Sequence, residues 1–245
     1  MNIIRRLSGL DKRIFERISS ANDLVLAAAD NPGMTKVLRE VFEQRTYADY
    51  FPFHQEATVV DIGAHVGFFS LFAYRNLAAA GRVISVEPDP INFQRLVHNL
   101  SINSFTQDHC VRAAVFTHDG TGELERGAST NHRLQAASPY ATNALSVPLL
   151  SLSSLFSRCS LERIDFLKMD CEGAEYDILY AQSTEIFARI HTISLEFHHG
   201  NTPERTGLAL ARHLRTVGFQ IPVYQHSPTR QGLNYGRLIA TRSAL

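Results

Sequence analysis

The stretch VVDIGAHVGFFS, residues 59–70, decides the fold of this 245-residue chain. An apolar run ends on the acid Asp61, the chain then turns through Gly63 and Gly67, and a second apolar run follows. This pattern is typical of a buried β-strand that leads through a tight turn into a helix. In open α/β sheets, ligands bind beyond the carboxyl ends of the strands, where such a turn lies. We therefore expect a ligand-binding site at this turn.

Outside this stretch, short apolar runs alternate with segments of helix length. The β-prone runs read AAGRVISVEP, DHCVRAAVF, RIDFLKMD, RIHTISLEF, GFQIPVYQ and LNYGRLIATR. Strands separated by helices indicate βαβ units, and thus a doubly wound α/β sheet with helices on both faces. We expect a helical cap over residues 1–50 and a ligand-binding domain over residues 51–245. Between residues 117 and 147 the pattern lapses, and we expect a small hairpin plus loop.

The overall composition argues against several classes of protein. The 24 basic and 24 acidic side chains cancel, and no segment concentrates either sign. This balance disfavours a nucleic-acid partner, because phosphate backbones are bound by clustered positive charge. The three cysteines lack metal-ligand spacing, so neither a disulfide framework nor a zinc site is indicated. A reducing, cytoplasmic location is the expectation.

The first twenty residues, MNIIRRLSGLDKRIFERISS, carry a charge every few positions. They have neither the apolar core of a signal peptide nor the roughly 20 apolar residues of a membrane-spanning helix. Their apolar residues recur at helical spacing, which predicts an amphipathic helix that packs on the domain. Peripheral membrane contact is the alternative, and an exposed helix of this kind would also suit a homodimer.

The second strand, RVISVE, ends on Glu87, twenty residues beyond Gly67. In nucleotide-binding folds an acid at this place accepts hydrogen bonds from both ribose hydroxyls, which predicts an adenosine-containing cofactor. The dinucleotide fingerprint is G-x-G-x-x-G without a preceding acid, whereas this turn has G-x-x-x-G spacing after Asp61. Asp61 would repel a diphosphate but suits the cationic amino-acid end of S-adenosylmethionine. The turn therefore favours S-adenosylmethionine over NAD.

A third segment, IDFLKMDCEGAEYDIL at residues 164–179, places Asp170 at the carboxyl end of a strand. Lys168 lies inside this buried strand, and because an unpaired buried charge is costly, we expect it to pair with a carboxylate. Glu175 lies at or near the start of the next helix, where its charge interacts favourably with the helix dipole. A purely stabilising role and a ligand contact are both open for Glu175.

The strand HTISLEFHHG, residues 191–200, brings Ser194, Glu196 and His198 to one side. An acid and two histidines at the rim of an apolar strand make poor packing material, so we look for a catalytic base here. His198 is the candidate, because histidine titrates near neutral pH. His199 replaces it if the strand register differs by one residue.

Taken together, the segments VVDIGAHVGFFS, ISVEPDP, FLKMDCEGAEYDIL and ISLEFH resemble the FkbM family of S-adenosylmethionine-dependent methyltransferases. The resemblance implies the class I methyltransferase fold, a Rossmann-like seven-stranded sheet whose last strand runs antiparallel. By this resemblance Glu87 would hold the ribose, and Asp170 would lie near the transferring methyl group. The methionine part would be held by Asp61, Gly63, Ala64 and Gly67.

Two further residues join the predicted cofactor site, and the catalytic set is small. His65 stands in the glycine turn where many family members have Asn, and Pro88 follows the ribose-binding acid. The predicted cofactor-binding residues are thus Asp61, Gly63, Ala64, His65, Gly67, Glu87, Pro88 and Asp170. The predicted catalytic residues are His198, Asp170 and His199.

The resemblance implies an O-methyltransferase that acts on a hydroxyl of a small molecule, a sugar unit or a natural product. Methyl transfer is an in-line displacement, and a hydroxyl acceptor must also lose its proton to a base or be acidified by a metal. We expect a metal-free route through His198. The alternative is Mg²⁺ held by Asp170, Glu196 and a histidine. Three other readings are a carboxyl methyltransferase, an NAD-dependent oxidoreductase and a non-catalytic cofactor-binding subunit.

Overall fold

The computed structural model describes residues 9–26, 32–106, 109–126, 132–135, 144–198, 200, 202–228 and 234–242. The helices are α1 (Gly9–Asn22), α2 (Pro32–Phe42), α3 (Phe68–Asn76), α4 (Pro90–Ile102), α5 (Leu152–Arg158), α6 (Glu175–Tyr180), α7 (Thr184–Ala188) and α8 (Gly207–Thr216). The strands are β1 (Thr58–Ile62), β2 (Arg82–Val86), β3 (Cys110–Val111), β4 (Ala114–Phe116), β5 (Gly120–Arg126), β6 (His132–Gln135), β7 (Ala144–Ser151), β8 (Ile164–Met169), β9 (Ile190–His198), β10 (Gln220–Pro228) and β11 (Asn234–Thr241). Within the described residues, none of the helices has the length and apolar character needed to cross a membrane.

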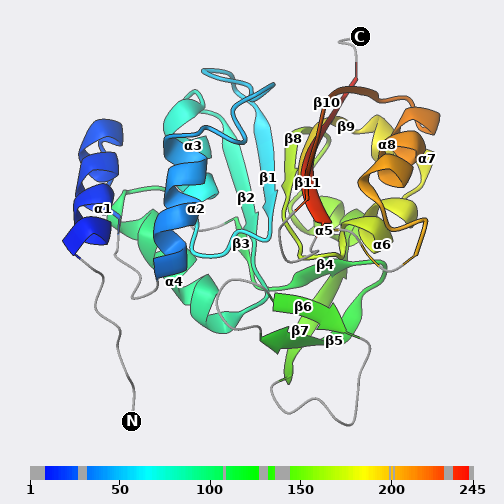
Figure 1. Ribbon diagram of the computed structural model, residues 1–245, viewed down its shortest axis with the longest axis horizontal. Helices are drawn as coiled ribbons and strands as arrows, with labels where there is room; N and C mark the ends of the chain where they lie inside the picture. The colour runs from blue at the N-terminus through cyan, green and yellow to red at the C-terminus, as the bar shows by residue number, and fades with distance from the viewer. Residues whose placement is uncertain are drawn as a thin grey trace.

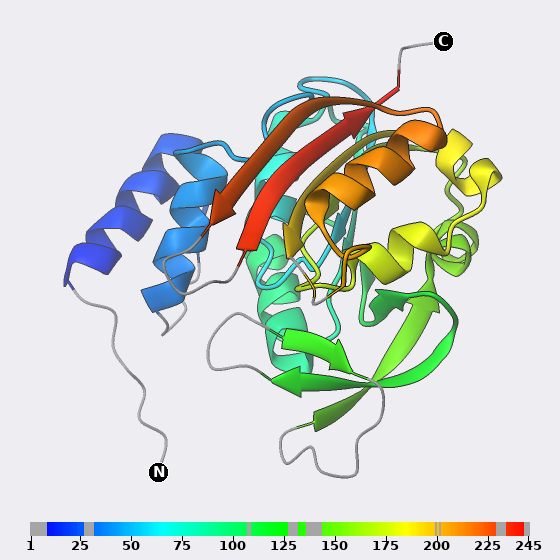
Figure 2. The ribbon, with the colours of Figure 1, turned by 45° about the vertical axis from the view of Figure 1, so that its right-hand side comes forward.

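The large sheet contains seven strands in the order β10-β11-β9-β8-β1-β2-β3. Its strands from β9 to β3 pair in parallel, whereas β11 runs antiparallel to both β9 and β10. Figure 2 shows β11 lying alongside β10 at one side of this sheet. Because β11 is the last described strand of the chain, the expected seven-stranded sheet with an antiparallel last strand is confirmed.

Helices cover both faces of the large sheet (Figure 1). Successive residues of β1 point to opposite faces, as the pleat of a strand requires. Val59 belongs to the core shared with α1, α2 and α3, and Val60 to the core shared with α5, α6, α7 and α8. Neither valine is exposed to solvent. The continuous apolar character of the strands thus follows from a sheet that is buried on both sides.

The helices α1 and α2 pack on the α3 side of the sheet through aromatic contacts. Phe15 of α1 meets Phe68 edge-on, and Phe42 of α2 meets Phe72 in the same way, with ring centroids 6.1 Å apart in both pairs. The amphipathic first helix therefore packs on the rest of the chain, as expected. The boundary between cap and ligand-binding domain at residue 50 stays a prediction.

The run DHCVRAAVF does not form one strand, contrary to the expectation from the sequence. The strand β3 ends at Val111, and β4 begins at Ala114 in a second sheet with the order β4-β7-β5-β6. The amide of Ala113 donates a hydrogen bond of 3.2 Å to the carbonyl of Val111, and the pairing of β3 with β2 ends after two residues. The strands β5 and β6 form the expected antiparallel hairpin. Figure 1 shows this small sheet at the bottom, below the large sheet.

One ion pair lies inside the large sheet, between β1 and β8. Nζ of Lys168 is 3.1 Å from Oδ1 of Asp61 and donates a hydrogen bond of 2.9 Å to the carbonyl of Gly63. Oδ2 of Asp61 accepts a hydrogen bond of 2.7 Å from Ser70. Burial alone would lower the pKa of Lys168, but the nearby charges of Asp61 and Asp170 raise it above its ordinary value. The expectation that Lys168 pairs with a carboxylate is confirmed.

The turn after β1 touches the end of β8 at Gly63. This glycine has a φ of +75°, and a methyl carbon added to it would lie 2.0 Å from the carbonyl oxygen of Asp170. The amide of Asp170 donates a hydrogen bond of 3.1 Å to the carbonyl of Ile62, just before the turn. Gly63 is therefore required for the close approach of two backbones, and not only for the approach of a ligand.

Replacing Lys168 with Met should destabilise the fold by about 3–5 kcal/mol, because it leaves the charge of Asp61 buried and uncompensated. Urea unfolding followed by circular dichroism would measure this loss. In the control variant Asp61→Asn/Lys168→Met the second charge is also removed. This double variant should recover part of the stability, and a double variant no more stable than Lys168→Met would contradict the pairing.

Replacing Gly63 with Ala should destabilise the fold by about 3 kcal/mol or more, because overpacking and an unfavourable backbone conformation add up. Gly173→Ala is the matched control: its φ is also positive, at +106°, but no atom outside its neighbours lies within 4 Å of the added carbon. It should therefore lose stability through backbone strain alone. Equal losses of unfolding free energy in the two variants would argue against the contact with Asp170.

Candidate functional site

The glycine turn after β1 is held by the end of β2. The amides of Gly63 and Ala64 both donate hydrogen bonds of 3.0 Å to the carbonyl of Val86. His65 has a φ of +53°, in the left-handed region that non-glycine residues seldom adopt, and its amide donates a hydrogen bond of 2.8 Å to Oε2 of Glu87. Gly67, with a φ of +89°, is the N-cap of α3. The predicted cofactor-binding residues of β1 and β2 thus form one connected turn.

Glu87 is almost completely buried at the end of β2, with 4% of its surface exposed. Its Oε1 accepts a hydrogen bond of 2.9 Å from the amide of Asp89, while His65 binds Oε2. Burial is the largest influence on this carboxyl and raises its pKa to about 7, although the two backbone hydrogen bonds act in the opposite direction. Each carboxylate oxygen retains a lone pair that a ligand hydroxyl can use.

Pro88 lies next to this acid, and the segment continues into α4. Asp89 is the N-cap of that helix, since its Oδ1 accepts hydrogen bonds from the amides of Ile91 at 2.8 Å and Asn92 at 3.0 Å. Pro90 fits the first helical position, where no amide donor is needed. The sequence Glu-Pro-Asp-Pro therefore fixes the position of the acid relative to the glycine turn.

A second group of polar side chains gathers where β8 and β9 end. His198, the last residue of β9, has its Nδ1 3.2 Å from Oε1 of Glu175 and its Nε2 3.6 Å from Oε2 of Glu172. Oε1 of Glu196 lies 3.9 Å from the same Nε2. Asp170 directly follows β8 and offers a carboxylate oxygen to this group. We call these five residues the acidic cluster: Asp170, Glu172, Glu175, Glu196 and His198.

Glu175 connects the helix start to the histidine. It is the first residue of α6 and is completely buried. Its Oε1 accepts a hydrogen bond of 3.0 Å from the amide of Cys171 and faces Nδ1 of His198. Glu175 thus ties the start of α6 to the cluster and orients a predicted catalytic residue, while its contact with a ligand stays a prediction.

The acidic cluster changes the protonation of its members. Burial lowers the pKa of His198, but the hydrogen bond to Glu175 and the charges of Glu175, Asp170 and Glu172 outweigh it and raise the pKa to about 10. Burial and repulsion by Asp170 raise the pKa of Glu196 to about 7, against the attraction of His198. The predicted role of His198 as a general base therefore requires that its proton leaves before the transfer step.

A set of possible metal ligands in the described residues differs from the alternative considered beside the expected metal-free route. Ligand atoms of Asp170, Glu172 and His198 all lie within 4.8 Å of one another. That alternative combined Asp170 and Glu196 with a histidine, but in the structure Glu172, two residues beyond Asp170, takes the place of Glu196. The D-x-E spacing at the end of a strand was the signal in the sequence, since it returns a second acid to the same rim.

The sequence predicts His199 as the substitute for His198 as base. His199 lies outside the described residues. His118, in the segment between β4 and β5, has its Nδ1 2.9 Å from the hydroxyl of Thr117 and is exposed.

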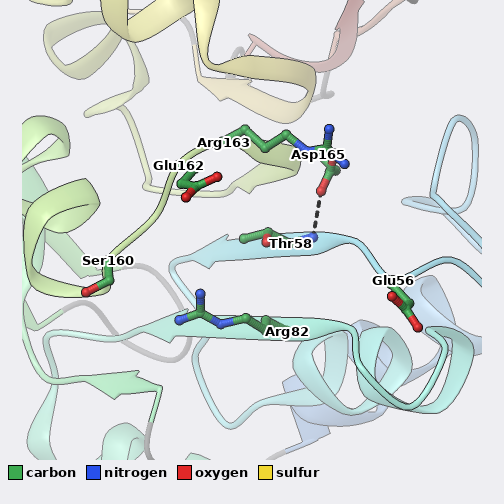
Figure 3. Close-up of a pocket in the computed structure, with 7 residues that line it drawn as sticks. All are labelled: Glu56, Thr58, Arg82, Ser160, Glu162, Arg163 and Asp165. Carbon is green, nitrogen blue, oxygen red and sulfur yellow. Dashed lines mark hydrogen bonds and ion pairs between the residues drawn. The ribbon is translucent and has the colours of Figure 1, made fainter.

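A polar pocket of about 380 Å³ lies at the opposite edge of the large sheet (Figure 3). It is lined at the amino ends of the strands by Thr58 of β1, Arg82 of β2 and Asp165 of β8. Oδ2 of Asp165 accepts a hydrogen bond of 2.7 Å from the amide of Thr58. Since ligands of α/β sheets bind beyond the carboxyl ends, we place the functional site at the glycine turn and the acidic cluster instead.

Comparison with solved structures supports the fold described above. The METTL16 MTase domain aligns with a TM-score of 0.53 at 10% identity, covering 96% of this chain and 80% of that chain. At this identity the likeness concerns the fold alone. The seven-stranded sheet is the class I methyltransferase fold, as the sequence implied.

Curated relatives are methyltransferases or contain a similar segment. Methyltransferase 1 of Beauveria bassiana is 24% identical over 227 residues, covering 84% of this chain and 88% of that protein. The AMB antimetabolite synthetase AmbE of Pseudomonas aeruginosa is 27% identical over 228 residues, covering 77% of this chain but 11% of that protein. The model of the Methyltransferase FkbM domain matches residues 61–221. Because this match covers more than half of the chain, the protein belongs to the FkbM methyltransferase family, with S-adenosylmethionine as its cofactor.

Proposed function

We propose that this methyltransferase transfers the methyl group of S-adenosylmethionine to a hydroxyl of a small molecule, a sugar unit or a natural product. The observation that carries the proposal is the meeting of two groups at one edge of the sheet. The glycine turn and the acidic cluster are joined through the contact of Gly63 with Asp170. A cofactor on the turn would therefore have proton-accepting groups beside its reactive end.

The cofactor would bind along the turn between β1 and β2. Glu87 would accept hydrogen bonds from the ribose hydroxyls, beside Pro88, and the backbone of Gly63, Ala64, His65 and Gly67 would line the methionine part. Asp61 has both carboxylate oxygens engaged, by Lys168 and by Ser70. Its part in cofactor binding would therefore be to position the turn, because Lys168 binds both Asp61 and the carbonyl of Gly63.

Methyl transfer to a hydroxyl requires alignment of the methyl donor with the acceptor oxygen and removal of the hydroxyl proton. The bond between sulfur and the methyl carbon breaks as the bond between carbon and the acceptor oxygen forms, and its electron pair stays on sulfur, giving S-adenosylhomocysteine. The hydroxyl proton must leave the acceptor, which suits a site rich in carboxylates. Asp170 would lie near the transferring methyl, and His198 would act on the acceptor oxygen from the end of β9.

The acidic cluster disfavours a carboxyl acceptor. Four carboxylates, those of Asp170, Glu172, Glu175 and Glu196, lie around one imidazole. In the cluster without a bound metal ion, an acceptor carboxylate would add a like charge to them, and like charges at close range repel. A neutral hydroxyl meets no such barrier on entry. The likeness to a segment of an antimetabolite synthetase supports an acceptor from natural-product chemistry.

A binding and turnover experiment tests the proposal. Calorimetry should give saturable binding of S-adenosylhomocysteine and none of NAD. Pairs of candidate acceptors that differ only in a hydroxyl or a carboxylate at one position should then release S-adenosylhomocysteine from the hydroxyl member alone. Binding of NAD, or turnover of the carboxylate members, would contradict the proposed cofactor or the proposed acceptor.

The affinity for S-adenosylhomocysteine should rise with pH through about 7. The ribose hydroxyls donate to the ionised form of Glu87, and neutral Glu87 has to lose a proton first. A group of pKa about 7 goes from roughly a tenth to nine tenths ionised between pH 6 and pH 8, so the affinity should rise about tenfold.

Glu87→Gln is the matched control for this pH dependence, because its amide does not titrate. This variant should bind more weakly and with a flat profile between pH 6 and pH 8. The neighbouring acid Asp89 is retained in both proteins, so its charge cancels from the comparison. A wild-type affinity that falls with pH, or a variant that keeps the full rise, would remove Glu87 from the ribose site.

A further inference from the structure

Three potential ligand atoms converge at the carboxyl edge of the large sheet. They belong to Asp170 after β8, Glu172 in the segment that follows, and His198 at the end of β9, and all lie within 4.8 Å of one another. A divalent ion with ligand distances of about 2.0–2.2 Å holds neighbouring ligand atoms roughly 3 Å apart. Small side-chain movements would therefore complete half of a coordination sphere here.

The imidazole of His198 is oriented for such a role. Its Nδ1 faces the carboxylate of Glu175 at 3.2 Å, which leaves Nε2 directed toward Glu172 at 3.6 Å. Metal-binding histidines almost always donate their second ring N–H to a carboxylate, which fixes the tautomer and the ring plane. Glu175 is itself held by the amide of Cys171, so the whole unit has a fixed orientation.

One carboxylate of the cluster is incompletely bonded in the part of the chain that the structure describes. Oε2 of Glu175 is buried and has no hydrogen-bond partner there, although the residue is completely shielded from solvent. Three nearby cations have carboxylate partners of their own: Lys168 pairs with Asp61, Arg205 with Asp177 and Arg237 with Asp49. A buried, incompletely bonded carboxylate is costly unless a cation lies near it.

We propose that Asp170, Glu172 and His198 bind one divalent transition-metal ion, which holds the acceptor hydroxyl opposite the methyl donor. An imidazole ligand together with two carboxylates favours Mn²⁺, Fe²⁺ or Zn²⁺ over Mg²⁺, which prefers oxygen ligands. The metal site stands on the geometry of the cluster alone. The placement of the acceptor rests on the proposed function.

A bound ion would change the chemistry of the acceptor. The ion lowers the pKa of a coordinated alcohol, so its proton can pass to a nearby carboxylate. Glu196 is suited to receive it, because its Oε1 lies 3.9 Å from Nε2 of His198 and outside the ligand set. The alkoxide then attacks the methyl carbon, and the electron pair of the carbon–sulfur bond remains on sulfur. His198 would in this case be a ligand and not a base.

Titration of the full chain with Mn²⁺ after treatment with EDTA tests the site without any acceptor. Electron paramagnetic resonance should show saturable binding of one Mn²⁺ per chain, and pulsed measurements should show a coordinated nitrogen that is absent in His198→Ala. Glu172→Gln, at a partly exposed position, should weaken binding by roughly 100-fold or more, since even losing an outer partner costs about 10–100-fold.

Glu196→Gln is the matched control, because it removes one negative charge from the same cluster but no proposed ligand. Its Mn²⁺ affinity should stay within the same order of magnitude as that of the wild type. Equal losses in Glu172→Gln and Glu196→Gln, or no saturable binding by the wild type, would overturn the site. Binding of S-adenosylhomocysteine in the presence of EDTA is measured on the same samples. If S-adenosylhomocysteine does not bind but Mn²⁺ does, the proposed function is refuted and the metal site is retained.

Discussion

The buried ion pair between Asp61 and Lys168 is the constraint around which the rest of the site is arranged. It joins neighbouring strands at the level where both approach the carboxyl edge. Two charges removed from water need good geometry and further hydrogen bonds, and here Ser70 and the carbonyl of Gly63 supply them. Because Lys168 reaches that carbonyl, the pair determines where the chain leaves β1 and begins its turn.

This arrangement explains why the two halves of the site lie together. With the turn fixed by Lys168, Gly63 lies against the backbone of Asp170, and only a residue without a side chain fits there. The glycine turn and the acidic cluster are therefore joined by one backbone contact between the ends of β1 and β8. A methyl donor and an acceptor need alignment to within a fraction of an ångström, and a contact between backbones holds such alignment better than a contact between flexible side chains.

The sequence predicted those features that depend on local pattern or on a strict physical penalty. The alternation of strands and helices follows from the apolar runs, and the pairing of Lys168 follows from the cost of an unpaired buried charge. The antiparallel last strand was implied by the family resemblance. The turn at Ala113 moves the chain into a second sheet, and it could not be predicted because the apolar run contains no signal for a break. The bridge from Glu175 to His198 was equally hidden, because it joins residues 23 positions apart through the end of a strand and the start of a helix.

The acidic cluster poses an electrostatic problem for the proposed methyl transfer to a hydroxyl. A hydroxyl that loses its proton beside Asp170, Glu172 and Glu196 becomes a further negative charge among carboxylates, and this raises the free energy of the alkoxide. A cofactor sulfonium held beside these carboxylates would be stabilised by them before transfer, and this stabilisation would end once the positive charge has gone. A cation inside the cluster would lower the free energy of the alkoxide and would weaken the stabilisation of the sulfonium. For the proposed methyl transfer to oxygen, a cation would therefore have its largest effect at the position next to Nε2 of His198, where the carboxylates converge.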